Sequence, residues 1–136
     1  MAFIPTNYEE GRIVNLPMST GETVVVGQVT VADTDGYYIT GASSAEDIRY
    51  VALEAAVTTA DGQRVRHIET EGVRFLVDTD NAPAQTDVGT WCDLADKNTL
   101  NPDASTNAQF YLESAILPLT AKKVTGYFTR GTPNVS

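Results

Sequence analysis

The chain has 136 residues, of which 42% are hydrophobic and 20% charged. This is the composition of a single ordinary globular domain, and it excludes a disordered or collagen-like chain. Eighteen acidic residues outweigh nine basic ones, giving a net charge of −9 and a pI near 4.3. That balance argues against a nucleic-acid partner, since binding to phosphates needs clustered basic residues. No apolar run approaches the roughly 20 residues that span a bilayer, so we expect no membrane partner.

Residue types that favour β-structure are abundant, with eighteen Thr and fourteen Val. Both are β-branched and fit well on a pleated surface, so the composition predicts a β-rich chain. Cys92 is the only cysteine and His67 the only histidine. An internal disulfide is therefore excluded, and a zinc site made of Cys and His ligands cannot be assembled.

Residues 1–16 are predicted to form an extended N-terminal arm, because proline and glycine punctuate the segment at short intervals. A mobile terminus has no need of apolar groups, so we expect this arm to lie on a surface, either of its own domain as an edge strand or of a partner. The side chains that would make this contact are Phe3, Ile4, Tyr8, Ile13 and Leu16.

The remaining segment, 17–136, is predicted to be a single β-domain. Short runs of β-branched and aromatic residues alternate with turn residues about every ten positions, which is typical of a small β-barrel or β-sandwich. We expect an all-β fold of seven to nine short strands with at most one short helix, at 43–47. Strands are expected within 22–32, 37–40, 48–58, 63–70, 73–77, 88–94, 110–117 and 122–130.

Two of these segments carry more specific expectations. Asp33-Thr34-Asp35-Gly36 is predicted to turn the chain from the first of these strands into the second as a hairpin. The strand 63–70 carries charge on both faces, which is typical of an edge or exposed strand.

Residues that perform catalysis are scarce. His67 has neighbours that suit a solvated strand better than a general base, and Cys92 beside Trp91 is typical of a small core residue. The sequence contains no phosphate-binding loop and no nucleophile elbow. We therefore expect no enzyme, no catalytic residues and no cofactor.

Two acidic clusters could in principle bind a cation through their carboxylate oxygens. Asp33-x-Asp35-Gly36 opens like a calcium loop but lacks the later ligands, so a hairpin turn explains it better. The loop 78–87, with Asp78, Asp80 and Asp87, is the best remaining set of oxygen ligands. A surface loop solvated by water explains it more simply, and we expect no metal site.

Several segments together form a recognisable pattern: the arm, the Val24–Val31 strand, Tyr37-Tyr38-Ile39, the Ser-Ala-Glu-Asp turn before Tyr50–Ala56, Asp87–Thr90, Thr99–Pro102 and Lys123–Phe128. This pattern resembles the head decoration, or cement, proteins of tailed bacteriophages. The resemblance covers most of the chain but depends on glycines, valines and turns.

The resemblance implies a structural virion protein, synthesised in the host cytoplasm, that binds the outer surface of the phage head. Its partner would be the major capsid protein, whose lattice it would stabilise as a homotrimer at local threefold positions. Within this interpretation, the arm residues Phe3, Ile4, Tyr8, Ile13 and Leu16 are the candidate capsid contacts.

Three alternatives remain. A tail or baseplate β-module would share this composition. A carbohydrate-binding β-sandwich would use Trp91, Tyr37, Tyr38 and Tyr111 as a stacking platform. A small acidic hydrolase would depend on Asp78, Asp80 and His67.

Overall fold

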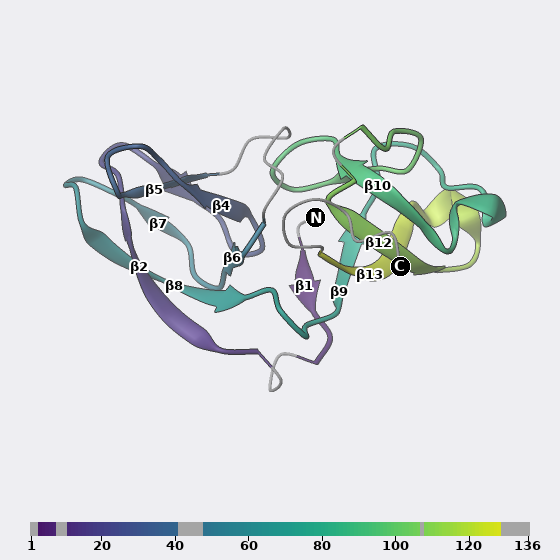
Figure 1. Ribbon diagram of the computed structural model, residues 1–136, viewed down its shortest axis with the longest axis horizontal. Coiled ribbons are helices and arrows are strands. Elements are labelled where there is room, and N and C mark those ends of the chain that lie inside the picture. The colour runs from purple at the N-terminus through teal and green to yellow at the C-terminus, as the bar shows by residue number, and fades with distance from the viewer. Residues whose placement is uncertain (1–2, 8–10, 41–47, 107, 129–136) are drawn as a thin grey trace.

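The computed structural model describes residues 3–7, 11–40, 48–106 and 108–128. These residues form thirteen strands and two 3-10 turns, η2 (Gln85–Asp87) and η3 (Leu119–Ala121). Figure 1 shows two lobes side by side, which we call the barrel lobe and the sheet lobe. The strands are β1 (Ile4–Pro5), β2 (Ile13–Met18), β3 (Thr23–Val24), β4 (Val29–Ala32), β5 (Tyr38–Thr40), β6 (Tyr50–Ala52), β7 (Ala56–Val57), β8 (Gln63–Glu69), β9 (Phe75–Asp78), β10 (Thr90–Leu94), β11 (Leu100–Asn101), β12 (Phe110–Ala115) and β13 (Lys123–Phe128).

The barrel lobe is a closed five-stranded barrel in the order β2-β5-β4-β6-β8. Its longest strand, β8, pairs with β2 over six residues on one side and with β6 on the other. A separate two-stranded sheet, β3 with β7, accompanies the barrel. A small apolar cluster of Met18, Val24, Ala52 and Val65 lies within this lobe.

The sheet lobe is a six-stranded antiparallel sheet in the order β1-β9-β13-β12-β10-β11. The chain enters it first through β1, whose Ile4 and Pro5 pair with Leu76 and Phe75 of β9. The β12–β13 pair needs glycine at position 126, because a Cβ there would overlap the Tyr111 carbonyl.

The main core is continuous across both lobes. Val29, Val51 and Ile68 lie opposite one another on β4, β6 and β8, and they belong to the same buried cluster as the phenylalanines of the sheet. Their alternation with Ala52 and Val65 shows that one face of these strands fills the barrel while the other packs on the sheet lobe. The two lobes therefore share one core.

Phe3 lies at the centre of this contact and is fully buried. Its backbone N–H donates to the Gly27 carbonyl of the barrel lobe over 2.9 Å. Its ring packs on Phe75, Phe110 and Phe128 of the sheet lobe, with centroid separations of 6.3, 5.9 and 4.8 Å. One residue thus joins the two lobes through its backbone and its side chain.

The all-β expectation is confirmed, including a barrel and the hairpin through Asp33–Gly36. Of the two expectations for residues 1–16, an edge strand of the chain's own domain is seen, because Ile4–Pro5 form β1 at the edge of the six-stranded sheet. The division into an arm and a separate domain at 16/17 does not match the described residues. Phe3 is part of the main core, Ile4 and Pro5 form β1, and the expected boundary at 16/17 falls inside β2. The helix expected at 43–47 lies outside the described residues.

The thirteen strands exceed the expected seven to nine, because two predicted strands are divided and β1, β2 and β11 lie outside the predicted strand segments. The 22–32 segment is broken by a turn in which Gly27 has a φ of +88°. The 48–58 segment divides because β6 pairs with β4 and β8, whereas β7 pairs with β3.

The 63–70 segment is not an edge strand, since β8 is paired on both sides. Arg64 and Arg66 are exposed and alternate with the buried Val65 and His67. The charges therefore mark the solvent face of a barrel strand rather than a sheet edge.

Replacing Phe3 by alanine is expected to lower the free energy of unfolding by about 3–5 kcal/mol, because it leaves a cavity where the lobes meet. Urea denaturation measures this loss. Ile4→Ala, one residue away at a side chain that is 39% exposed, is the matched control and should cost about 1 kcal/mol or less. Equal losses for the two variants would contradict the role given to Phe3.

Candidate docking cleft

The structure separates the predicted contact residues into two groups. Phe3 and Leu16 are buried, so their side chains hold the fold and are not offered to a partner. Ile4 and Ile13 are 39% and 44% exposed, so part of each side chain is open to solvent. Tyr8 lies outside the described residues.

Ile4 and Ile13 line the same cleft between the two lobes, of about 570 Å³. Ile4 and Pro5 of β1 form its wall on the sheet-lobe side. Ile13 of β2, Arg66 of β8 and Leu53, which follows β6, form the wall on the barrel side. Among the described residues the lining of the cleft is therefore largely apolar, with one cationic side chain.

The barrel wall of the cleft continues the shared core. Ile13 pairs with Ile68, which in turn pairs with Val51, so three apolar residues lie in a row across β2, β8 and β6. Ile68 and Val51 are fully buried against the sheet lobe, but Ile13 lies beyond the end of that contact. The cleft opens where the two lobes diverge.

Hydrogen bonds hold the Leu53–Arg66 part of the wall. The Leu53 N–H donates to the Arg66 carbonyl over 2.8 Å, and the Arg66 N–H donates to Glu54 Oε1 over 2.6 Å. These bonds use the backbone of Arg66 and leave its guanidinium exposed. Sequence reasoning missed Leu53, Arg66 and Pro5 because their meeting depends on cross-strand pairing between distant segments.

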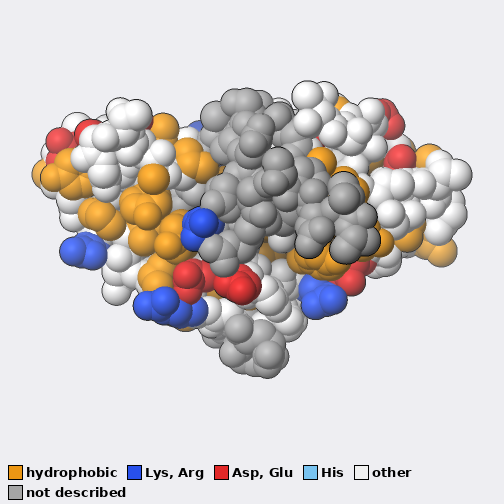
Figure 2. Space-filling model, in the orientation of Figure 1, with side chains coloured by type: hydrophobic (Ala, Val, Ile, Leu, Met, Phe, Trp, Pro, Cys, Tyr) orange, Lys and Arg blue, Asp and Glu red, His pale blue; other side chains and the backbone are white. Residues whose placement is uncertain are grey.

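Cationic side chains gather on the β2–β8 surface beside the cleft. Arg66 lies opposite Asn15, and Arg64 Nη1 donates to the carbonyl of that asparagine over 3.2 Å. Arg12 lies beside Ile13 and forms a 3.5 Å ion pair with Glu69. Arg66 has no ion pair within the part of the chain that the structure describes. Figure 2 shows apolar side chains exposed on the barrel lobe, with basic side chains at its lower margin.

Other exposed apolar side chains lie away from the cleft. Val25, Val26 and Val57 are about half exposed or more, at 47%, 51% and 66%, beside the β3–β7 pair. Ile116 and Leu117 lie between β12 and η3 in the sheet lobe, and Leu117 is 74% exposed. Only the cleft combines apolar side chains from both lobes with a cation, among the residues described.

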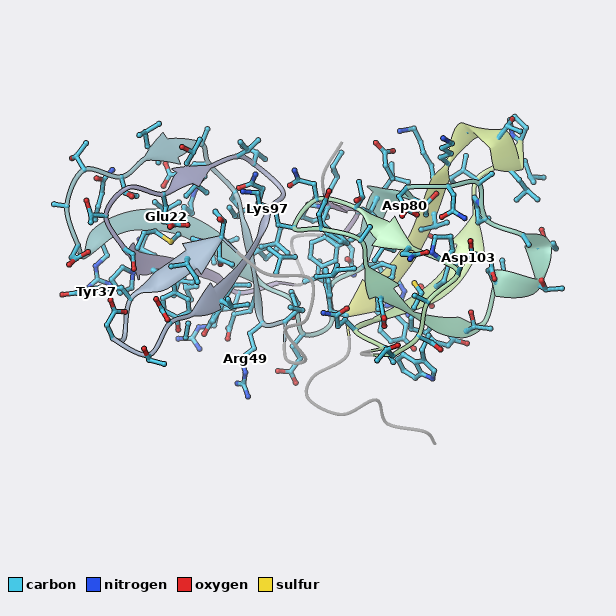
Figure 3. The ribbon with its side chains drawn as sticks, turned by 90° about the horizontal axis from the view of Figure 1, so that it is seen from above. Glu22, Tyr37, Arg49, Asp80, Lys97 and Asp103 are labelled. Atoms are coloured by element: carbon cyan, nitrogen blue, oxygen red, sulfur yellow. The ribbon has the colours of Figure 1, made fainter. Side chains whose placement is uncertain are left out.

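The proposed stacking platform is not assembled. Trp91 and Tyr111 do meet, with ring centroids 4.8 Å apart, but Figure 3 shows Tyr37 at the end of the barrel lobe away from the sheet lobe. Tyr38 also belongs to the barrel, on β5.

The tyrosine rings on the outer face of the sheet pack on neighbouring side chains of the same chain. Tyr111 packs on Tyr127 at 5.2 Å, and the Arg74 guanidinium lies 5.4 Å from the centre of the Tyr127 ring. Glu113 holds Arg74 there through two hydrogen bonds of 2.8 and 3.1 Å. This row of side chains covers the outer face of the sheet as a cross-strand ladder.

The two residues weighed as catalytic groups are buried. His67 is fully buried and its Nδ1 lies 2.8 Å from the Val65 carbonyl, so Nδ1 carries the proton. Burial lowers the pKa of His67 despite that hydrogen bond. Cys92 is also fully buried, and burial together with Asp93 and Asp87 raises its pKa to about 12.

Most carboxylates of the acidic clusters are engaged in structural bonds, whereas Asp80 is exposed. Asp33 and Asp35 accept N–H groups within their own hairpin turn. Asp78 is paired with Lys123 over 2.6 Å, and Asp87 accepts the Ala84 N–H. Figure 3 shows Asp80 and Asp103 on the sheet lobe, where the carboxylate of Asp103 accepts a hydrogen bond from Asn81.

Within residues 3–7, 11–40, 48–106 and 108–128, no group of three or more His, Cys, Asp or Glu side chains is placed to hold a metal ion. The described residues also include no helix that has the length and apolar character to cross a bilayer.

Comparison with known proteins gives a structural likeness. No protein-family model matches the sequence, and no curated protein sequence matches it. Among solved structures, the crystal structure of the head fiber gp8.5 N base of bacteriophage phi29 has a similar fold, with a TM-score of 0.57. The alignment covers 90% of this chain and 99% of that chain at 15% sequence identity, so the likeness is one of fold.

The Cys92 thiol is expected to be unreactive in the folded protein, because a pKa of about 12 leaves almost no thiolate at neutral pH. An aromatic disulfide reagent at about pH 8 measures this, with release of its coloured thiol as the readout. One equivalent should react after unfolding in guanidinium, and rapid reaction of the native protein would contradict the burial.

The folded protein is expected to lose stability as the pH falls through 6.5, the ordinary pKa of histidine. Because the folded-state pKa of His67 is lowered, the unfolded chain binds more protons below that pH. His67→Gln removes this titration and keeps a donor for the Val65 carbonyl. Urea denaturation at about pH 7.5 and about pH 5.5 should show a smaller pH effect in the variant. An unchanged pH effect would exclude His67 as its source.

Proposed function

We propose that this chain is a structural protein of a tailed-phage virion that binds the outer surface of the head and stabilises the lattice of major capsid subunits. The observation that carries the proposal is the fold it has in common with a phage head protein along almost the full length of both chains. The sequence resemblance to head decoration proteins was found from different features, so the two arguments support each other.

The surface of the molecule supports a binding role. The cleft presents Ile4 and Ile13 to solvent although a large core is available, which is a pattern typical of protein contacts. His67 and Cys92 are buried among packing residues, where neither reaches a substrate. We therefore propose a protein that acts through its surfaces and has no catalytic step.

Assembly as a homotrimer at local threefold positions is part of the proposal. A closed ring of identical subunits repeats each contact, so a modest interface per subunit is enough for tight attachment. Attachment at many sites would hold neighbouring capsid subunits against the pressure of packaged DNA.

The alternatives are less well supported. A tail or baseplate module is compatible with the fold, but the similar solved structure is that of a head component. A carbohydrate-binding function is disfavoured because the rings of Tyr111 and Tyr127 are covered by each other and by Arg74.

The purified chain is expected to bind saturably to expanded heads that lack it, prepared from the phage that encodes it. Cosedimentation with densitometry gives the number of copies bound per head. Bound heads should then release DNA at a higher temperature than bare heads, measured with a dye that reports free DNA.

The decisive controls are unexpanded heads and isolated tails. Binding to tails but not to heads would overturn the proposal in favour of a tail module. Saturable binding without a change in DNA release would leave attachment intact and refute lattice stabilisation. Deletion of residues 1–16 is not a clean test, because it removes Phe3 from the core and most of β2.

A further inference from the structure

We propose that the cleft between the lobes is the capsid-binding site, and that it binds an acidic segment of a head protein in which an apolar side chain lies next to a carboxylate. The inference deepens the proposed function and rests on it. It follows from three features of the cleft: its apolar walls, the cation at its margin and the charge of the rest of the molecule.

The apolar walls determine the first half of the recognition. Ile4 and Ile13 are about two-fifths exposed and face a space of about 570 Å³ together with Pro5 and Leu53. That volume lies within the range of roughly 300–1,000 Å³ found for binding pockets. An inserted aliphatic or aromatic side chain would bury the exposed parts of both isoleucines and extend the shared core outward.

Arg66 determines the second half. Its guanidinium lies at the cleft and forms no ion pair with the described residues, although its backbone is fixed by Glu54 and Leu53. A guanidinium offers a planar pair of N–H donors that matches a carboxylate. Arg64, whose side chain turns toward Asn15 opposite Arg66, places a second cation nearby.

The charge of the molecule limits where an acidic partner can dock. The full chain carries −9, so its surface as a whole repels an acidic segment. On the β2–β8 surface beside the cleft, Arg12, Arg64 and Arg66 face Glu54 and Glu69 among the described residues, so this region is locally positive. An acidic segment would therefore be directed to the cleft.

A second copy of the chain fits the cleft less well. Among the described residues the most exposed large apolar side chain is Leu117, and Lys122 follows it closely. Inserting Leu117 into the cleft would bring Lys122 toward Arg64 and Arg66, whereas Lys123 is paired with Asp78. The repulsion between like charges favours a head protein as the occupant.

The test measures the affinity of full-length variants for the same expanded heads. Arg66→Glu reverses the cation and Ile13→Asp makes an apolar wall polar, and each should weaken binding at least about tenfold. Arg66→Lys should retain part of the affinity, since it keeps the charge but loses the planar fork. Ile4→Asp is a second wall variant in case Ile13→Asp does not fold.

Matched controls carry the same chemical changes elsewhere. Lys122→Glu reverses an exposed cation in the sheet lobe, and Val57→Asp alters an apolar residue that is 66% exposed on β7. Both should bind within about twofold of the original chain, because surface substitutions away from a contact have small effects. Thermal unfolding of every variant confirms that it is folded.

Salt gives an independent readout. Binding of the original chain should weaken as ionic strength rises, and binding of Arg66→Met should weaken less, because one screened charge pair has been removed. Equal salt dependence of the two proteins would show that Arg66 forms no ion pair with a carboxylate of the partner.

The outcomes separate the two proposals. If the original chain does not bind heads, the proposed function fails. If it binds and the cleft variants bind as well as their controls, the proposed function stands and the cleft is excluded as the docking site. If the cleft variants instead lower the mass of the free protein in analytical ultracentrifugation, a second copy occupies the cleft and the inference is overturned.

Discussion

The ring of Phe3 lies between the barrel and the sheet, at the centre of the core that the two lobes share. Its N–H is bonded to Gly27 of the barrel lobe, and its ring packs on phenylalanines of the sheet lobe, including Phe128 near the other end of the chain. The chain therefore passes through the core at Phe3 before it forms β1 and then β2. Because β1 belongs to the sheet and β2 to the barrel, the chain passes from one lobe to the other at this point. The cleft between Ile4 and Ile13 is the geometric result of that passage.

The local features of the fold were predictable from sequence, and the long-range ones were not. The hairpin through Asp33 and Gly36 depends on neighbouring residues, and it is present as expected. Whether β8 is an edge strand or an inner strand depends on which strands pair with it, and its charged residues do not indicate that pairing. The apolar content of residues 1–16 correctly indicated contact with a surface, but Phe3 contacts its own core. Burial in a shared core and burial against a partner leave the same pattern in a sequence.

The same limit applies to the candidate site. Ile4 and Ile13 were predicted as contact residues from their apolar character, and the structure leaves both exposed at one cleft. Arg66 was not predicted, because its role depends on lying opposite Asn15 and next to Leu53, which are distant in sequence. His67 and Cys92 are the residue types that could act in catalysis, and both are fully buried in the fold. The chemistry of the surface is thus set by which apolar and cationic side chains the lobes leave uncovered.

Pro5 limits how the edge of the six-stranded sheet can pair with another strand. Phe3 and Thr6 direct their N–H groups to opposite sides of the segment, toward Gly27 and toward Arg74 of the adjacent strand. By strand alternation, position 5 shares the orientation of Phe3, and its amide would face the open side of β1. Proline has no N–H there, so a neighbouring molecule cannot extend the sheet at this residue. The missing donor therefore opposes strand pairing between molecules at this end of the sheet.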